Sequence, residues 1–124
     1  MGRKPIHFLG SSQKDIRTLP EDVQDAFGSA LLDAQYGDMP DGARRFGEGL
    51  PREVMKLAED FDGDTYRAAY TMAFPLAVYV LHIFQKKSKS GIATPERDKN
   101  LIRRRLNQAE EHYRRVYEKA GGKR

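Results

Sequence analysis

The sequence predicts an α+β fold in which helices pack on one face of a sheet. Apolar runs and alternation indicate strands near the start and in the middle of the chain, whereas apolar residues spaced by three and four indicate helices. The predicted order is a strand, two helices, an antiparallel meander of three strands and a C-terminal helix. A chain of 124 residues can bury one core but not two, so residues 1–124 are expected to form one domain.

The first strand and the two helices after it have recognisable boundaries. The run Ile6-His7-Phe8-Leu9 is apolar and ends at Gly10, which is typical of a short strand. Ser12 and Thr18 are each followed three residues later by an acidic residue, a pattern that caps helices. The apolar face of the second helix is expected to consist of Val23, Phe27, Ala30, Leu31 and Ala34.

The meander begins after a loop. Residues 37–51 are rich in Gly, Pro, Asp and Arg and have no apolar period, so they are predicted to form a surface loop that carries Arg44 and Arg45. A strand then begins near Val54, and Asp62-Gly63 is a turn that tight hairpins prefer. These features predict the first two strands of the meander.

Alternation in the next strand separates its charged and aromatic residues. Arg67 is expected to point away from Tyr66 and Tyr70, because successive side chains of a strand lie on opposite faces. Residues 77–84 are apolar on both faces, which is typical of a strand in the middle of a sheet. This last strand continues without a break into a cationic end that contains Lys86, Lys87 and Lys89.

The C-terminal helix is predicted from a cap and one apolar stripe. Thr94 and Pro95 form the start, with Glu96 placed favourably for the helix dipole. The helix is expected to run to about residue 119. Its stripe consists of Ile102, Leu106, Ala109, Tyr113, Val116 and Ala120, and is interpreted as core rather than as a binding groove.

Composition limits the environment and the partners. The chain has no cysteine, so disulfides and thiolate metal sites are excluded. It has neither an apolar leader nor a segment of about 20 apolar residues, so a cytoplasmic protein without a membrane span is expected. Residues 1–60 contain 8 Lys/Arg and 11 Asp/Glu, whereas residues 61–124 contain 14 and 7. The basic half favours phosphate-rich partners, although a solvated charged surface is the alternative.

Several familiar catalytic arrangements are missing. The sequence contains no phosphate-binding glycine loop, no dinucleotide fingerprint and no His-Glu-x-x-His pair. His7, His82 and His112 are dispersed, and Asp60, Asp62 and Asp64 surround a turn that such residues commonly form. We therefore expect neither a metal nor a cofactor.

Cations on neighbouring strands remain as the candidate chemistry. RNA cleavage without a metal needs a group that takes the proton of the 2′-hydroxyl and charges that stabilise the phosphate. A crowded lysine has a lowered pKa and can act as the base, and the planar fork of an arginine can hold two phosphate oxygens. The candidates are Lys56, Arg67, Lys86 and Lys87, with Arg44, Arg45 and Lys89 as further RNA-binding residues.

Four motifs carry a resemblance to a known family: Lys4-Pro5-Ile6-His7, Gly10–Asp15, Asp60–Tyr70 and above all Tyr79–Pro95. With these motifs, most of the chain resembles the phage-derived toxin-like family within the RelE/ParE superfamily, which includes HigB-like toxins of type II toxin-antitoxin pairs. The resemblance implies a RelE-like fold. It also implies roles for the cations: Lys56 as general base, Arg67 within Tyr66-Arg67-Ala68-Ala69-Tyr70 as transition-state anchor, and Lys86 or Lys87 as phosphate clamp or acid.

Structural roles compete with each of these assignments. Arg67 could instead pair with Glu59 or Asp60 across the hairpin, and the lysines could form an ordinary charged strand end. His82 has the phase of Val80 in its strand, so a packed histidine is favoured over a catalytic one, although some related toxins use histidine as a proton carrier.

The catalytic tyrosine that RelE-type enzymes carry near the C-terminus has no matching motif here. Tyr113 and Tyr117 are assigned to the helix face instead. The residue that protonates the leaving group is therefore open.

The resemblance implies a toxin that cleaves messenger RNA, on the translating ribosome, and is neutralised by a cognate antitoxin of the helix-turn-helix type. One alternative is a ParE-like protein that inhibits DNA gyrase by binding. The other is an inactive relative derived from a prophage. The pairing of Lys56 and Arg67 on adjacent strands favours the nuclease.

Overall fold

The computed structural model describes residues 2–86 and 93–118. Its first half contains β1 (Ile6–Phe8), α1 (Ser12–Arg17), α2 (Glu21–Gln35) and β2 (Arg44–Arg45). They are followed by β3 (Met55–Phe61), β4 (Asp64–Thr71), β5 (Val78–Lys86), α3 (Glu96–Tyr113) and the π-helical turn η1 (Arg114–Glu118). The predicted α+β class and order of elements are confirmed, with one additional short strand: β2 lies within the segment that was predicted to be only loop.

Five strands form one sheet in the order β1-β5-β4-β3-β2. β1 runs parallel to β5, and the other neighbours are antiparallel. β5 therefore has a neighbour on each side, as its apolar pattern predicted. The predicted hairpin turn is also confirmed, because Phe61 pairs with Asp64 and the two residues between them, Asp62 and Gly63, have φ angles of 52° and 86°.

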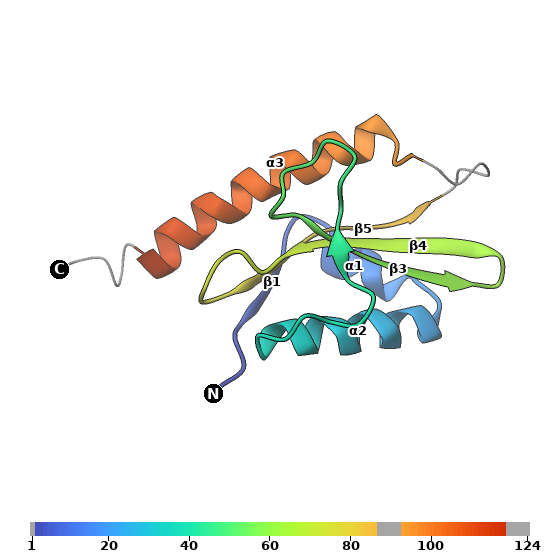
Figure 1. Cartoon of the computed structure of the whole chain (residues 1–124), viewed down its shortest axis with the longest axis horizontal. Coiled ribbons are helices and arrows are strands. Elements are labelled where there is room, and N and C mark those ends of the chain that lie inside the picture. Colours follow the sequence, from blue (N-terminus) through green and yellow to red (C-terminus); the bar gives the residue numbers. More distant parts are fainter. Residues whose placement is uncertain (1, 87–92, 119–124) are drawn as a thin grey trace.

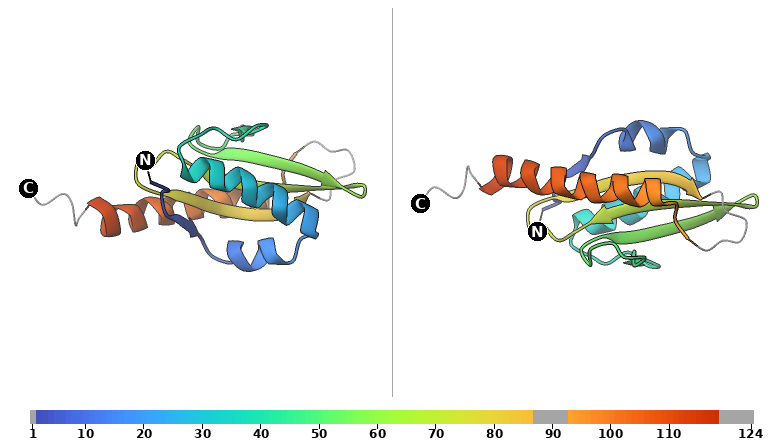
Figure 2. Two further views of the ribbon diagram at one scale, coloured as in Figure 1. Left: turned by 90° about the horizontal axis from the view of Figure 1, so that it is seen from below. Right: turned by 90° about the horizontal axis from the view of Figure 1, so that it is seen from above.

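The prediction that the helices pack on one face of the sheet is wrong. α2 and α3 lie on opposite sides of the sheet (Figure 1): α2 lies in front of the sheet in the view from below, and α3 lies in front of it in the view from above (Figure 2). One core cluster joins α2 to side chains such as Tyr70 and Val80, whereas the other joins α3 to Ala69 and Tyr79. The two central strands bury both of their faces, so each face needs a helix to cover it.

A β-bulge interrupts β5. Tyr70 of β4 pairs with Val80, but the preceding residue, Ala69, pairs with His82, so Leu81 has no partner in β4. Side chains after Leu81 consequently change face: Val80 packs in the cluster under α2, whereas Phe84 packs in the cluster under α3. The prediction that His82 shares the face of Val80 is therefore wrong.

The end of the last helix also differs from the prediction. α3 ends at Tyr113 and continues into the π-helical turn, whose wider turn changes the phase of the side chains. Tyr117 then packs against the core, whereas Val116 is 41% exposed. Val116 was predicted to belong to the apolar stripe, and this part of the prediction is wrong. Ala120 lies outside the described residues.

Candidate active site

Four of the seven predicted site residues share one face of the sheet. Directly paired residues of antiparallel strands lie on the same face. Arg44 pairs with Lys56, which pairs in turn with Ala69, so both cations lie on the face that α3 covers. Arg67 precedes Ala69 by two residues, and Lys86 pairs with Thr65, which lies two residues before Arg67. We call the face of the sheet that carries Arg44, Lys56, Arg67 and Lys86 the cation face.

Arg45, a further predicted cation, does not lie on this face. Arg45 alternates with Arg44 and lines a hollow on the opposite side of the sheet with Met55 and Met72. Its proposed role beside the other RNA-binding cations is therefore not supported by its position. Lys87 and Lys89 lie outside the described residues.

Lys56 is half-buried among positive charges. Its Nζ lies 5.2 Å from the centre of the Phe46 ring, which is a cation–π contact. Burial lowers the pKa of Lys56 below its ordinary value, and the charges of Arg67, Arg44 and Lys86 lower the pKa further, against the opposing effect of Glu48. This environment increases the fraction of neutral amine, which is the form that accepts a proton.

Arg67 is held by two residues from outside the strands. Its Nη1 lies 3.6 Å from Glu48 Oε2 and donates a hydrogen bond to Thr94 Oγ1 at 3.2 Å. The predicted alternative, an ion pair with Glu59 or Asp60, is wrong. Asp60 accepts instead from the hydroxyl of Thr65.

Glu48 is the residue that the sequence reasoning missed. It lies in the loop between β2 and β3 and has a φ of 56°, between two glycines that also have positive φ. Its Oε1 accepts the amide hydrogen of Thr94 at 2.7 Å, and its Oε2 accepts the hydroxyl of Thr94 at 3.2 Å. Burial raises the pKa of Glu48, but the Thr94 hydrogen bonds and the charges of Arg67 and Lys56 outweigh it and lower the pKa overall. An ionised carboxylate therefore lies beside Arg67.

His82 lies on the cation face because of the bulge, but it is buried. Its Nε2 lies 2.8 Å from Oδ1 of Asp98 in α3, and its ring stacks on Phe84 with centroids 4.7 Å apart. Burial lowers the pKa of His82, although the hydrogen bond and charge of Asp98 oppose this. The burial and the Asp98 contact agree with the prediction of a packed histidine.

Across residues 2–86 and 93–118, no three His, Asp or Glu side chains gather in a way that could hold a metal ion. In the same ranges, no helix is long and apolar enough to cross a membrane.

Comparisons with known proteins agree with this fold. Residues 14–107 match the family described as "Phage derived protein Gp49-like (DUF891)". The chain belongs to this family. A solved structure of a mutant of the Escherichia coli toxin RelE in the free state is similar in fold, with a TM-score of 0.51 and 16% sequence identity over 73% of this chain and 88% of that chain. No curated protein matches the sequence.

Membership of the Gp49-like family confirms the predicted phage-derived, RelE-type toxin family. The matched range includes the whole cation face together with Glu48, Thr94 and His82. At 16% identity, the likeness to RelE establishes the fold and not the activity of this chain.

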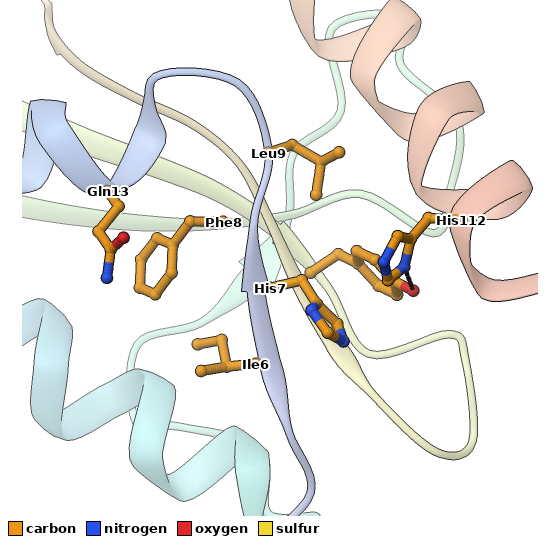
Figure 3. Close-up of a pocket in the computed structure, with 7 residues that line it drawn as sticks. Ile6, His7, Phe8, Leu9, Gln13 and His112 are labelled. Atoms are coloured by element: carbon orange, nitrogen blue, oxygen red, sulfur yellow. Dashed lines mark hydrogen bonds between the residues drawn. The ribbon is translucent and has the colours of Figure 1, made fainter. Parts of the chain in front are cut away.

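A second polar cluster lies near the other end of α3. Tyr117 hydroxyl and His7 Nε2 are 2.7 Å apart, as are Tyr79 hydroxyl and His112 Nδ1. His7 and His112 border a hollow beside β1 (Figure 3), and their ring centroids are 4.6 Å apart. No local pattern indicates this pairing, because the two histidines are 105 positions apart in the sequence.

The tyrosines of the last helix belong to this distant end. Tyr113 is buried and its hydroxyl accepts the amide hydrogen of Leu76, so both it and Tyr117 lie on the helix face, as predicted. An α-helix rises about 1.5 Å per residue, so Tyr113 lies roughly 25 Å along α3 from its first turn, which borders the cation face. Neither tyrosine is placed to protonate a leaving group beside Arg67.

Proposed function

We propose that this protein is the toxin of a toxin-antitoxin system and a metal-free endoribonuclease that cleaves messenger RNA on the ribosome. The observation that carries the proposal is the gathering of Lys56, Arg67 and Lys86 on one sheet face, with Lys56 in an environment that lowers its pKa. Family membership supports the toxin role. A cognate antitoxin of the helix-turn-helix type is the proposed partner that neutralises it.

The reaction needs only the substrate's own nucleophile. Lys56, in its neutral form, accepts the proton of the 2′-hydroxyl, whose oxygen attacks the adjacent phosphorus. Arg67 stabilises the negative charge that grows on the phosphate oxygens. The bond from phosphorus to the 5′-oxygen then breaks, and that oxygen takes a proton from Lys86 or Lys87. The products are a 2′,3′-cyclic phosphate and a 5′-hydroxyl end.

Glu48 must change partner for this reaction to proceed. Its carboxylate lies beside Arg67 where a phosphate would be expected to bind, and it is held there by Thr94. An entering phosphate competes with Glu48 for the guanidinium, and the flanking glycines allow the loop to move aside. RNA binding is therefore expected to loosen the contact between Arg67 and Glu48.

The first test is induced expression of the wild type beside Arg67→Ala, with growth followed while the 5′ ends of cellular messages are mapped. Arg104→Ala is the matched control, because it also removes one arginine charge, but from an exposed position of α3 outside the cation face. Growth arrest with new ends inside reading frames, lost only in Arg67→Ala, supports the ribonuclease. Arrest with intact messages contradicts it and favours inhibition of gyrase, and soluble protein without arrest favours an inactive relative.

A further inference from the structure

The bulge at Leu81 determines which side chains of β5 reach the cation face. Strict alternation from Val78 and Val80 would place Lys86 on the face that α2 covers. The extra residue reverses the phase, so that Lys86 pairs with Thr65 and lies on the same face as Arg67. An irregularity in the backbone is thus required to assemble the site from β3, β4 and β5.

The bulge is held from α3 by a buried arginine. Arg105 is 9% exposed, and its Nη1 donates a hydrogen bond to the carbonyl oxygen of Leu81 at 3.0 Å. A bulge disrupts the ladder and leaves backbone groups of its extra residue without their strand partner. Among the residues that the structure describes, no carboxylate lies within ion-pair distance of Arg105. Among the described residues, the hydrogen bond to Leu81 is the shortest polar contact of the Arg105 guanidinium.

The segment Gly10-Ser11-Ser12 shapes the other side of the same guanidinium. A Cβ atom at Gly10 would lie 2.5 Å from Cζ of Arg105, so only glycine permits this approach, and Gly10 also has a φ of 56°. The hydroxyls of Ser11 and Ser12 lie 3.5 Å from Arg105 nitrogens. Three segments that are distant in sequence thus meet at the guanidinium of Arg105.

We propose that Arg105 is a positioning residue, which stabilises the bulge at Leu81 and thereby places Lys86 on the face of Arg67. It acts through the backbone of β5 and does not itself touch substrate. The role of Arg105 in stabilising the bulge does not depend on any enzymatic activity, whereas its consequence for RNA cleavage rests on the proposed ribonuclease activity.

The test compares Arg105→Met, which keeps the length of the side chain but removes its donors, with two controls on the same helix. Arg104→Met makes the same change at an exposed position, and Ile102→Ala lowers stability by opening the core without touching the bulge. In each folded variant, cross-strand nuclear Overhauser effects are measured for the pairs Ala69 with His82 and Arg67 with Phe84.

Loss of both cross-strand signals in Arg105→Met, with retention in the two controls, is the expected result. Cleavage by Arg105→Met is then expected to fall to the level of Lys86→Ala. Intact pairing in folded Arg105→Met would overturn the positioning role, whatever its activity. Altered pairing without any cleavage by the wild type would sustain the positioning role and contradict the proposed function instead.

Deletion of Leu81 supplies an independent test. Removing the extra residue eliminates the bulge but keeps His82, Phe84 and Lys86 on their present faces, because His82 then follows Val80 directly. Arg105→Met should therefore no longer disturb the pairing when it is combined with this deletion. A disturbance of the same size in both backgrounds would contradict the proposal.

Should Arg105→Met not fold, the wild type itself provides the measurement. A guanidinium bound to a buried carbonyl gives separate, slowly exchanging Nη proton signals, and we expect these for Arg105 but not for Arg104. Averaged signals for Arg105 would show that it does not hold the bulge.

Discussion

Glu48 Oε2 lies 3.6 Å from Nη1 of Arg67, so the anchor proposed for the phosphate already contacts an anion in the free protein. Both side chains are mostly shielded from water, with 22% and 11% of their surfaces exposed. Thr94 fixes the pair by donating to both carboxylate oxygens and accepting from Arg67. The free protein therefore holds the proposed phosphate anchor in a pre-formed position, where a phosphate would have to compete with Glu48.

Removing the charge of Glu48 should strengthen RNA binding. Glu48→Gln keeps the shape of the side chain but no longer competes with phosphate for Arg67, so we expect affinity to rise by about 1 kcal/mol, or roughly fivefold. The measurement is fluorescence anisotropy at fixed salt with an RNA whose 2′-hydroxyls are replaced by hydrogen. Glu53→Gln makes the same change at an exposed position elsewhere and should leave affinity nearly unchanged. Equal gains from both variants would show a non-specific charge effect.

The dependence of cleavage on pH should report Lys56. Because Lys56 must lose its proton before it acts as base, the rate should rise with pH, and Lys56→Arg should reduce it by about 10²–10⁴-fold. Arg44 is one of the charges that lower the pKa of Lys56, so Arg44→Ala should raise this pKa and move the rising limb to higher pH. Single-turnover rates across the pH range test this. A limb that stays in place in Arg44→Ala would remove Lys56 from the role of base.

Stability should decrease in mildly acidic solution. Burial lowers the pKa of His82, and burial together with His112 lowers that of His7. The histidines of the unfolded chain, with a pKa of 6.5, therefore bind protons at a higher pH than those of the folded chain. The free energy of unfolding consequently decreases as the pH falls below 6.5. Thermal melts between about pH 7.5 and about pH 5 should show this decrease, and His7→Gln should reduce its slope. A melting temperature that is constant or rises on acidification would contradict the sign.

Substitution by alanine should have opposite effects on the stability of the fold at two glycines. Gly28 lies in α2 with open space around its Cβ position, so Gly28→Ala should stabilise the fold by about 0.5–1 kcal/mol. Gly10→Ala should destabilise it by more than that, because the Cβ meets Arg105 and the φ is positive. Urea denaturation of both variants gives the two free energies of unfolding. A neutral Gly10→Ala would mean that Arg105 does not occupy its described position.

The sequence predicted the elements better than their arrangement in space. The apolar face of α2, the Asp62-Gly63 turn and the central position of β5 follow from local patterns, and all three are present. The side of the sheet on which each helix packs depends on contacts between distant segments. The small residue Ala69 gave little sign that its face would be covered by α3.

The candidate site could be predicted as far as alternation holds. Lys56, Arg67 and Lys86 are predicted from their positions on strands, and Lys86 joins the face of the other two only because Leu81 interrupts the alternation of β5. Glu48 was missed because it lies in a loop without a period. Glu48 lies between Gly47 and Gly49, and all three residues have positive φ angles. The two glycines are the one local sign in the sequence of an unusual backbone there.

The most direct test of the proposed reaction is the chemistry of the RNA ends. Purified wild type and Arg67→Ala would be added to a translation extract with a defined message, and the ends of the fragments would be analysed. The proposed reaction produces fragments with 2′,3′-cyclic phosphate and 5′-hydroxyl ends when the wild type is added and not when Arg67→Ala is added. Fragments with 5′-phosphate ends, fragments produced equally by Arg67→Ala, or an intact message would contradict it.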